Sequence, residues 1–148
     1  MKIKAGTGSS ALKDAFEAGK EAATAAIAAL EGEEPALVMV FTMPHYDLDV
    51  LLAGIQSVTG SARLAGATSS GEMVNGTYMG FGGGVAVTAI TAGPYRFGIA
   101  SASHIYEDLM EAGQQIARVA KAEAGPSPHA ALILLADCMA GNLSLIHI

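Results

Sequence analysis

The feature that most constrains the fold is an unbroken apolar run at residues 36–41, Ala-Leu-Val-Met-Val-Phe, directly after Pro35. A run of this length is typical of a strand that is covered on both faces, which usually has a parallel neighbour. Helical periodicity flanks it on both sides. Apolar side chains share one face in the preceding segment, which ends near Leu30, and again in residues 47–58. This alternation predicts an α/β fold.

The rest of the chain repeats the pattern. We expect further strands at residues 2–6, 63–67 and 130–136 and a third helix at 107–123. Asp47 is placed to cap the second helix, and Ser9 or Ser10 the first. Residues Val85–Ile90 and 95–100 flank the turn sequence Ala-Gly-Pro, which predicts an antiparallel hairpin. The predicted fold class is α/β, with a mixed, largely parallel sheet, helices on both faces and this hairpin.

Composition excludes several classes of protein. With 148 residues, of which 51% are hydrophobic, the chain suits one folded domain. The net charge is −6 and the eight basic residues are scattered, which disfavours binding to nucleic acid or an anionic membrane. The single cysteine, Cys138, excludes an intrachain disulfide. Neither a transmembrane run nor a signal peptide is visible, so we expect a cytoplasmic protein.

The end of the chain is unusual for a complete domain. Residues 143–148, Leu-Ser-Leu-Ile-His-Ile, form an apolar tail directly after a predicted core strand. We therefore predict one ligand-binding domain at residues 1–142 that is incomplete at its C-terminus. Residues 143–148 are then interpreted as a tail that is not native to it.

Two glycine-rich segments resemble phosphate-binding motifs without matching them. Gly6-x-Gly8-x-x-Ala11 has the spacing of a dinucleotide fingerprint, but the second predicted strand ends without the acidic residue that would hold a ribose. Residues 80–84 lack a lysine and precede a strand, so no helix terminus faces an anion there. We interpret the first segment as a turn and the second as a flexible turn or bulge.

Ser69 lies at the centre of Ala67-Thr68-Ser69-Ser70-Gly71, which resembles a relaxed nucleophile elbow. The residues that follow show no helical period, whereas an elbow needs a helix. A triad would require a distant acid and a distant histidine, from Asp108 or Asp137 with His129 or His147. No two histidines have the spacing of a metal site, and His104 is a candidate haem ligand only as a lone residue.

Two loops offer the best candidate site. One follows the second predicted strand and the other follows the third, and parallel strands bind ligands at their carboxyl ends. The loops carry hydroxyls, an imidazole, a phenol and a carboxylate, and a glycine that permits close approach by a small molecule. The candidate ligand-binding residues are Thr42, His45, Tyr46, Thr68, Ser69, Ser70, Gly71 and Glu72. The alternative is that they serve only as caps and turn residues.

These same segments resemble the FIST N-terminal domain. The resemblance lies in Phe41-Thr42-Met43-Pro44-His45-Tyr46-Asp47 and most specifically in Gly66-Ala67-Thr68-Ser69-Ser70-Gly71-Glu72, and it extends over residues 6–136. It implies an intracellular sensory domain of signal transduction that binds a small ligand, with amino acids suggested for the family. It further implies a FIST C-terminal domain and a downstream signalling module as partners.

From these observations we expect a non-enzymatic sensor without a cofactor, in which the ligand orders residues 68–84. Glu72 is the expected charged recognition group for an ammonium, and Thr68, Ser69 and Ser70 supply hydrogen bonds. Three alternatives stay open. They are a serine hydrolase that uses Ser69, a haem-dependent nitric-oxide sensor that uses His104, and a half-domain whose surface only docks a missing part.

Overall fold

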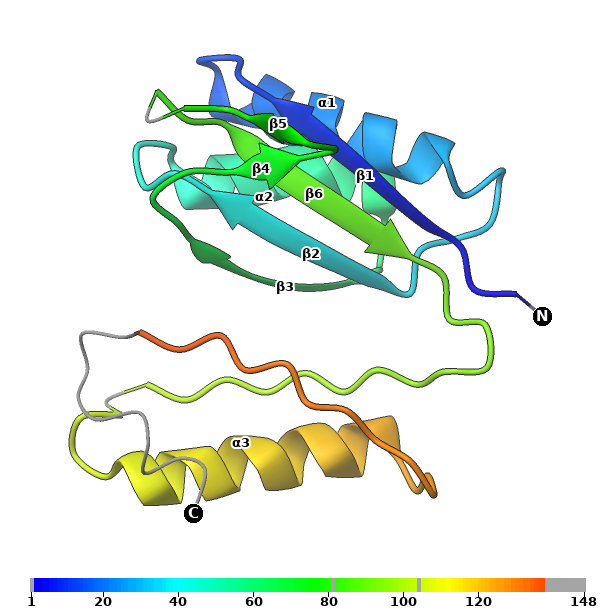
Figure 1. The fold of residues 1–148 in the computed structure, drawn as a ribbon, viewed down its shortest axis with the longest axis vertical. Helices are drawn as coiled ribbons and strands as arrows, with labels where there is room; N and C mark the ends of the chain where they lie inside the picture. The colour runs from blue at the N-terminus through cyan, green and yellow to red at the C-terminus, as the bar shows by residue number, and fades with distance from the viewer. Residues whose placement is uncertain (1, 81, 104, 138–148) are drawn as a thin grey trace. The chain divides into compact units, whose positions relative to one another are not determined.

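The computed structural model describes residues 2–80, 82–103 and 105–137 (Figure 1). It divides into two compact units, Met1–Tyr95 and Arg96–Ile148. The first unit contains the sheet, two helices and both loops of the predicted site. The described residues of the second contain one helix among segments without regular secondary structure.

A four-stranded sheet organises the first unit. Its strands lie in the order β1 (Ala5–Ser10), β6 (Val85–Ile90), β2 (Leu37–Thr42) and β3 (Arg63–Thr68). β2 and β3 are parallel, whereas β6 runs antiparallel to both β1 and β2. The mixed α/β class is therefore confirmed, with parallel pairing confined to β2 and β3.

A small hairpin interrupts the chain between β3 and β6. β4 (Met73–Val74) pairs with β5 (Thr77–Tyr78) in antiparallel register. The turn residues Asn75 and Gly76 have φ angles of 50° and 80°, and this left-handed pair matches the twist of a two-residue hairpin. We predict one loop over residues 68–84, but this segment contains an antiparallel hairpin.

Helices α1 (Ala15–Ala28) and α2 (Leu48–Thr59) lie together on one face of the sheet (Figure 1). Each begins at an aspartate whose side chain accepts a hydrogen bond from the third helical amide, Asp14 in α1 and Asp47 in α2. The cap predicted at Asp47 is confirmed, whereas the cap of α1 is Asp14 and not Ser9 or Ser10. Helices on both faces were expected, but α1 and α2 share one face and α3 (Leu109–Ala124) belongs to the second unit.

Small residues allow α1 to lie close to the sheet. Gly6 and Gly8 point toward α1, where a Cβ at Gly8 would overlap the Ala22 carbonyl oxygen. The prediction of a turn at Gly6-Thr7-Gly8 is therefore wrong, because these glycines are strand residues that make room for a helix backbone. The core beneath them joins α1, α2 and the helix-facing side chains of the strands, namely Ala18, Ala22, Ala23, Ala26, Leu30, Val38, Val40, Leu51, Ile55, Val85, Val87 and Ala89.

Two predicted strands do not form. Residues 95–100 are not a strand, because both edges of β6 are already paired, with β1 and with β2. Residues 130–136 are extended but unpaired within the described part of the chain, and Leu132 and Ile133 are 65% and 68% exposed. An apolar run becomes a strand only when a neighbour accepts its hydrogen bonds.

Candidate functional site

The register of the sheet brings four chain segments to one edge. Ser10 at the end of β1, Thr42 at the end of β2 and Thr68 at the end of β3 align with Val85, where β6 begins. The pairing continues one residue further, because the Ser69 amide donates to the Thr42 carbonyl at 2.9 Å. The loops that leave β2 and β3 therefore lie side by side, as do the loop after β1 and the loop before β6.

Glu72 is the most unusual residue at this edge. It is only 3% exposed. Its Oε1 accepts a hydrogen bond from Ser69 Oγ at 2.6 Å, and its backbone carbonyl accepts one from the Met79 amide at 2.9 Å. Its other carboxylate oxygen, Oε2, is buried and has no hydrogen-bond partner among the described residues. A buried carboxylate oxygen that has lost its hydration and accepts no hydrogen bond destabilises the folded protein.

Tyr46 connects the β2 loop to the loop after β1. Its side chain is 6% exposed, and its hydroxyl donates to the Leu12 carbonyl at 2.6 Å. Burial raises the pKa of the Tyr46 phenol, and the negative charge of Glu72 raises it further. The charge of Glu72 therefore acts on the Tyr46 side chain, although the two residues lie on different loops.

The β2 loop packs against the loop that leads into β6. Thr42 is buried, and its Oγ1 donates to the Gly84 carbonyl at 3.1 Å. His45 is exposed, and the centroid of its ring lies 4.1 Å from the centroid of the Tyr46 ring. A Cβ added at Gly83 would lie 3.3 Å from Cε1 of His45. Gly83 has a φ of +63° and also abuts the Met43 side chain, so only glycine fits there.

The remaining predicted residues line the rim. Thr68 and Ser70 are exposed, and Ser69 is half-buried. Gly71 donates its amide to Ser69 Oγ at 3.4 Å, and a Cβ there would lie 2.8 Å from Cε2 of Tyr78. The structure thus gathers all eight predicted residues at one edge. Ser69, Glu72 and Tyr46 form its interior, and Thr42 serves to hold the loops.

A groove in the first unit begins at the same edge. It has a volume of about 220 Å³ and lies between α2, β2 and β3. Its lining residues are Val40, Thr42, Leu48, Leu51, Leu52, Leu64, Ala65, Gly66, Ala67 and Thr68. The two threonines are at the carboxyl ends of β2 and β3, so the polar end of the groove adjoins the candidate site.

Sequence reasoning missed the contributions of the other two loops. The Leu12 carbonyl accepts from Tyr46, and the Gly84 carbonyl accepts from Thr42. Ser10 Oγ donates to the Glu21 carboxylate. No side-chain motif could have indicated backbone carbonyls, but the glycine run at 80–84 was a signal of close packing. The sequence predicts a flexible turn or bulge there, whereas Gly83 and Gly84 are buried.

The alternative sites find little geometric support. After β3 the chain enters the β4–β5 hairpin instead of a helix, so Ser69 does not lie on a nucleophile elbow. Asp108 caps α3. Across residues 2–80, 82–103 and 105–137, no three His, Cys, Asp or Glu side chains gather as a metal site. His104, Cys138 and His147 lie outside the described residues.

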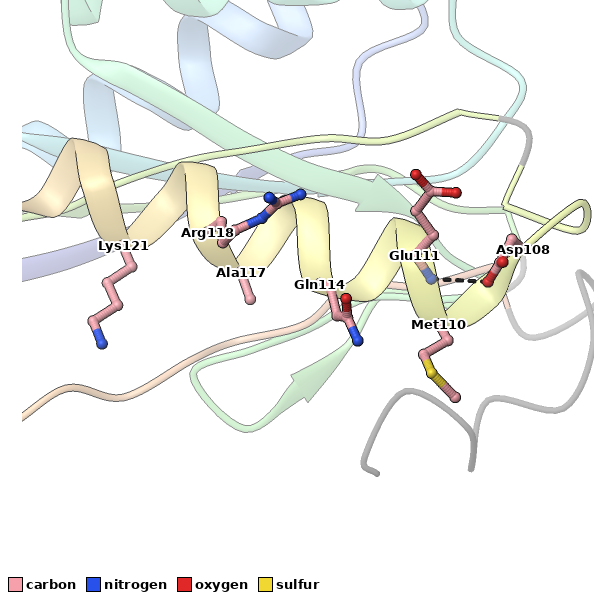
Figure 2. Close-up of a pocket in the computed structure, with 7 residues that line it drawn as sticks. All are labelled: Asp108, Met110, Glu111, Gln114, Ala117, Arg118 and Lys121. Atoms are coloured by element: carbon pink, nitrogen blue, oxygen red, sulfur yellow. Dashed lines mark hydrogen bonds between the residues drawn. The ribbon is translucent and has the colours of Figure 1, made fainter.

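A second and larger groove lies in the other unit, along α3. It has a volume of about 770 Å³, and Figure 2 shows its side chains projecting from that helix. All of its lining residues belong to α3 or its cap, namely Asp108, Met110, Glu111, Gln114, Ala117, Arg118 and Lys121. Because no second element contributes polar groups to it among the residues that the structure describes, the edge of the sheet is the better candidate site.

Comparison with known proteins identifies the family of the chain. The family model of the FIST N domain matches residues 36–146, three quarters of the chain, including every predicted site residue. No curated protein matches the sequence. In the part of the chain that the structure describes, every helix is too short or too polar to cross a membrane.

Proposed function

Because the chain belongs to the FIST N domain family, which comprises sensory domains of signal transduction, we propose that it senses a small molecule bearing a protonated amine. The proposed site is the sheet edge around Glu72. Free amino acids are the first class of ligand to test, since each carries an ammonium group.

The observation that carries this proposal is the unpartnered Oε2 of Glu72. Burial of a carboxylate is costly unless its oxygens receive hydrogen bonds or a counter-charge. Ser69 satisfies one oxygen, whereas the second, which is buried, has no donor among the described residues. An ammonium supplies both a hydrogen-bond donor and the opposite charge. Its binding energy therefore comes from the Glu72 carboxylate, which the fold already holds in position.

The neighbouring side chains suit a small polar ligand. The Ser69 hydroxyl donates to Glu72 and can accept a hydrogen bond in return. Thr68 and Ser70 are exposed at the rim, where their hydroxyls are available to a bound molecule. His45 adds an exposed imidazole on the opposite loop.

The signal would arise as a shift between arrangements of the β4–β5 hairpin. The Glu72 carbonyl and the Met79 amide close this hairpin at its base, so a ligand on the Glu72 side chain acts where the hairpin is anchored. A ligand that favours one arrangement shifts the population toward it. FIST N domains pair with FIST C-terminal domains in signalling proteins, and we propose such a domain as the reader of this change.

A thermal-shift screen of the chain against amino acids and simple primary amines tests the proposal. A ligand at 100 times its Kd adds about 2.7 kcal/mol to the stability of the folded state, which raises the melting temperature by several degrees. The rise should disappear in Glu72→Gln and persist in Glu34→Gln, which removes the same charge from an exposed position. Failure of every amine, or an undiminished rise in Glu72→Gln, would refute the proposal.

We further propose that the domain binds its ligand without chemistry and without a cofactor. The Ser69 hydroxyl is held by a carboxylate at 2.6 Å, so labelling by a fluorophosphonate probe is a direct check. Labelling that is lost in Ser69→Ala would establish a serine hydrolase instead. A Soret band that appears on titration with haemin and is lost in His104→Ala would establish a haem sensor.

A further inference from the structure

We infer that the ligand carries, besides its amine, an apolar side chain about as large as a branched butyl or benzyl group, which binds in the groove between α2 and β3. This inference rests on the proposed function, because Glu72 must hold the amine. It adds the class of ligand that the site selects.

The volume of the groove sets the size of the side chain. A cavity of about 150 Å³ is enough to hold benzene. The groove, at about 220 Å³, therefore has room for a branched aliphatic or a single aromatic group. A whole extended peptide or a dinucleotide would exceed it several-fold.

The lining of the groove sets its chemistry. None of its ten described lining residues is charged, and apart from Thr42 and Thr68 all of them are apolar or glycine. Leucines of α2 form one wall, and Leu48 is 42% exposed there. Opposite them, residues 65–67 of β3 are Ala, Gly and Ala, and these small residues leave the space open. A bound apolar group would remove this leucine surface from water.

Ser69 connects the groove to the carboxylate along the chain, although neither Ser69 nor Glu72 is among the residues that line the groove. Thr42 and Thr68 line the groove at the carboxyl ends of their strands. Ser69 follows Thr68 directly, its amide donates to the Thr42 carbonyl, and its hydroxyl donates to Glu72. One residue therefore separates the polar end of the groove from the hydrogen bond to the carboxylate. In the proposed complex, the amine lies at Glu72 and the apolar part of the ligand enters the groove past Thr68.

Three small probes separate the two halves of the ligand in a calorimetric titration of the chain. They are 3-methylbutylamine, ethylamine, which lacks the branched part, and 4-methylpentanoate, which has the branched part and the opposite charge. We expect 3-methylbutylamine to bind at least about tenfold more tightly than ethylamine, since each buried methylene strengthens binding several-fold. We expect no binding of 4-methylpentanoate.

Two variants on α2 form a matched pair. Leu48→Ser places a hydroxyl in the groove, and Val50→Ser makes the same kind of change at an equally exposed residue that does not line it; both are 42% exposed. Leu48→Ser should weaken 3-methylbutylamine about fivefold or more and leave ethylamine unchanged. Val50→Ser should change neither.

The outcomes distinguish this inference from the proposed function. If both amines bind equally, and Glu72→Gln abolishes binding whereas Leu48→Ser does not affect it, the amine site stands and the apolar groove is refuted. If neither amine binds, the proposed amine site and the proposed ligand of the groove are both refuted. If 4-methylpentanoate binds as well as the amine, the requirement for Glu72 is refuted.

Discussion

Replacement of Gly8 by alanine tests the close contact between β1 and α1. The position of the loop that follows β1 depends on this contact. A Cβ at Gly8 would overlap the Ala22 carbonyl oxygen and lie 2.7 Å from Ala25 Cβ and 2.8 Å from the Ala26 amide nitrogen. Carbon atoms pack favourably at about 3.5–4.0 Å. Two of the three atoms belong to the helix backbone and cannot rotate away, so α1 itself must move by roughly 1 Å.

The expected cost is substantial for a single methyl group. Overpacking of a core costs about 1–3 kcal/mol, and displacement of a helix backbone belongs at the upper end of that range. The loss of glycine flexibility in the unfolded chain offsets about 0.4–1 kcal/mol of it. We therefore expect Gly8→Ala to lower the free energy of unfolding by about 2 kcal/mol.

Urea denaturation measures this change directly. With a slope of about 2 kcal/mol/M, a loss of about 2 kcal/mol moves the midpoint down by about 1 M. The matched control is Gly82→Ala, because a Cβ at Gly82 meets no atom within 4 Å and its φ lies outside the left-handed region. Its midpoint should stay or rise slightly. A Gly8→Ala midpoint within about 0.2 M of the control would show that β1 and α1 do not touch as described.

Three further substitutions test the site and its supports. Tyr46→Phe removes the hydrogen bond to the Leu12 carbonyl and should cost about 1–2 kcal/mol in urea denaturation. Burial, and after it the charge of Glu72, raises the pKa of Tyr46. The contribution of this phenol to stability is therefore complete below the unfolded-state pKa of about 10 and is lost as the pH rises through the higher folded-state pKa, so Tyr46→Phe should flatten that alkaline decline. Asp47→Ala removes the cap of α2 and should cost about 1 kcal/mol, largely restored in Asp47→Asn. Lys4→Gln breaks surface ion pairs with Glu31 and Glu33, so its melting temperature should fall at low salt and match wild type in 1 M NaCl.

Local signals predicted the elements that carry most of the site. β2 is a continuous apolar run bounded by Pro35, and α2 has a capping aspartate, an apolar stripe and a terminal glycine, Gly60. These features are encoded within a few residues, and the predicted ends of both β2 and α2 lie within about two residues of the observed ends. The proximity of the two loops followed from the parallel pairing of β2 with β3.

The other predictions failed because they depend on pairing between segments that are far apart in the sequence. β6 lies between β1 and β2, and nothing within residues 85–90 indicates which strands border it. Once both of its edges are paired, residues 95–100 cannot join it, whatever their β propensity. The error at Gly6-Thr7-Gly8 has the same origin. Glycines favour turns locally, but here a distant helix backbone requires them in a strand.

The burial of Glu72 was equally invisible in the sequence, and it determines the chemistry of the site. The side-chain donors in the interior of this edge are already engaged: Thr42 Oγ1 with Gly84, Tyr46 Oη with Leu12 and Ser69 Oγ with Glu72 itself. One buried acceptor, Glu72 Oε2, has no donor in the described part of the chain. An anionic or purely accepting ligand would add a second acceptor next to it, whereas an ammonium supplies the missing donor and cancels the charge. The balance of donors and acceptors therefore favours a cationic ligand on grounds independent of the family to which the chain belongs.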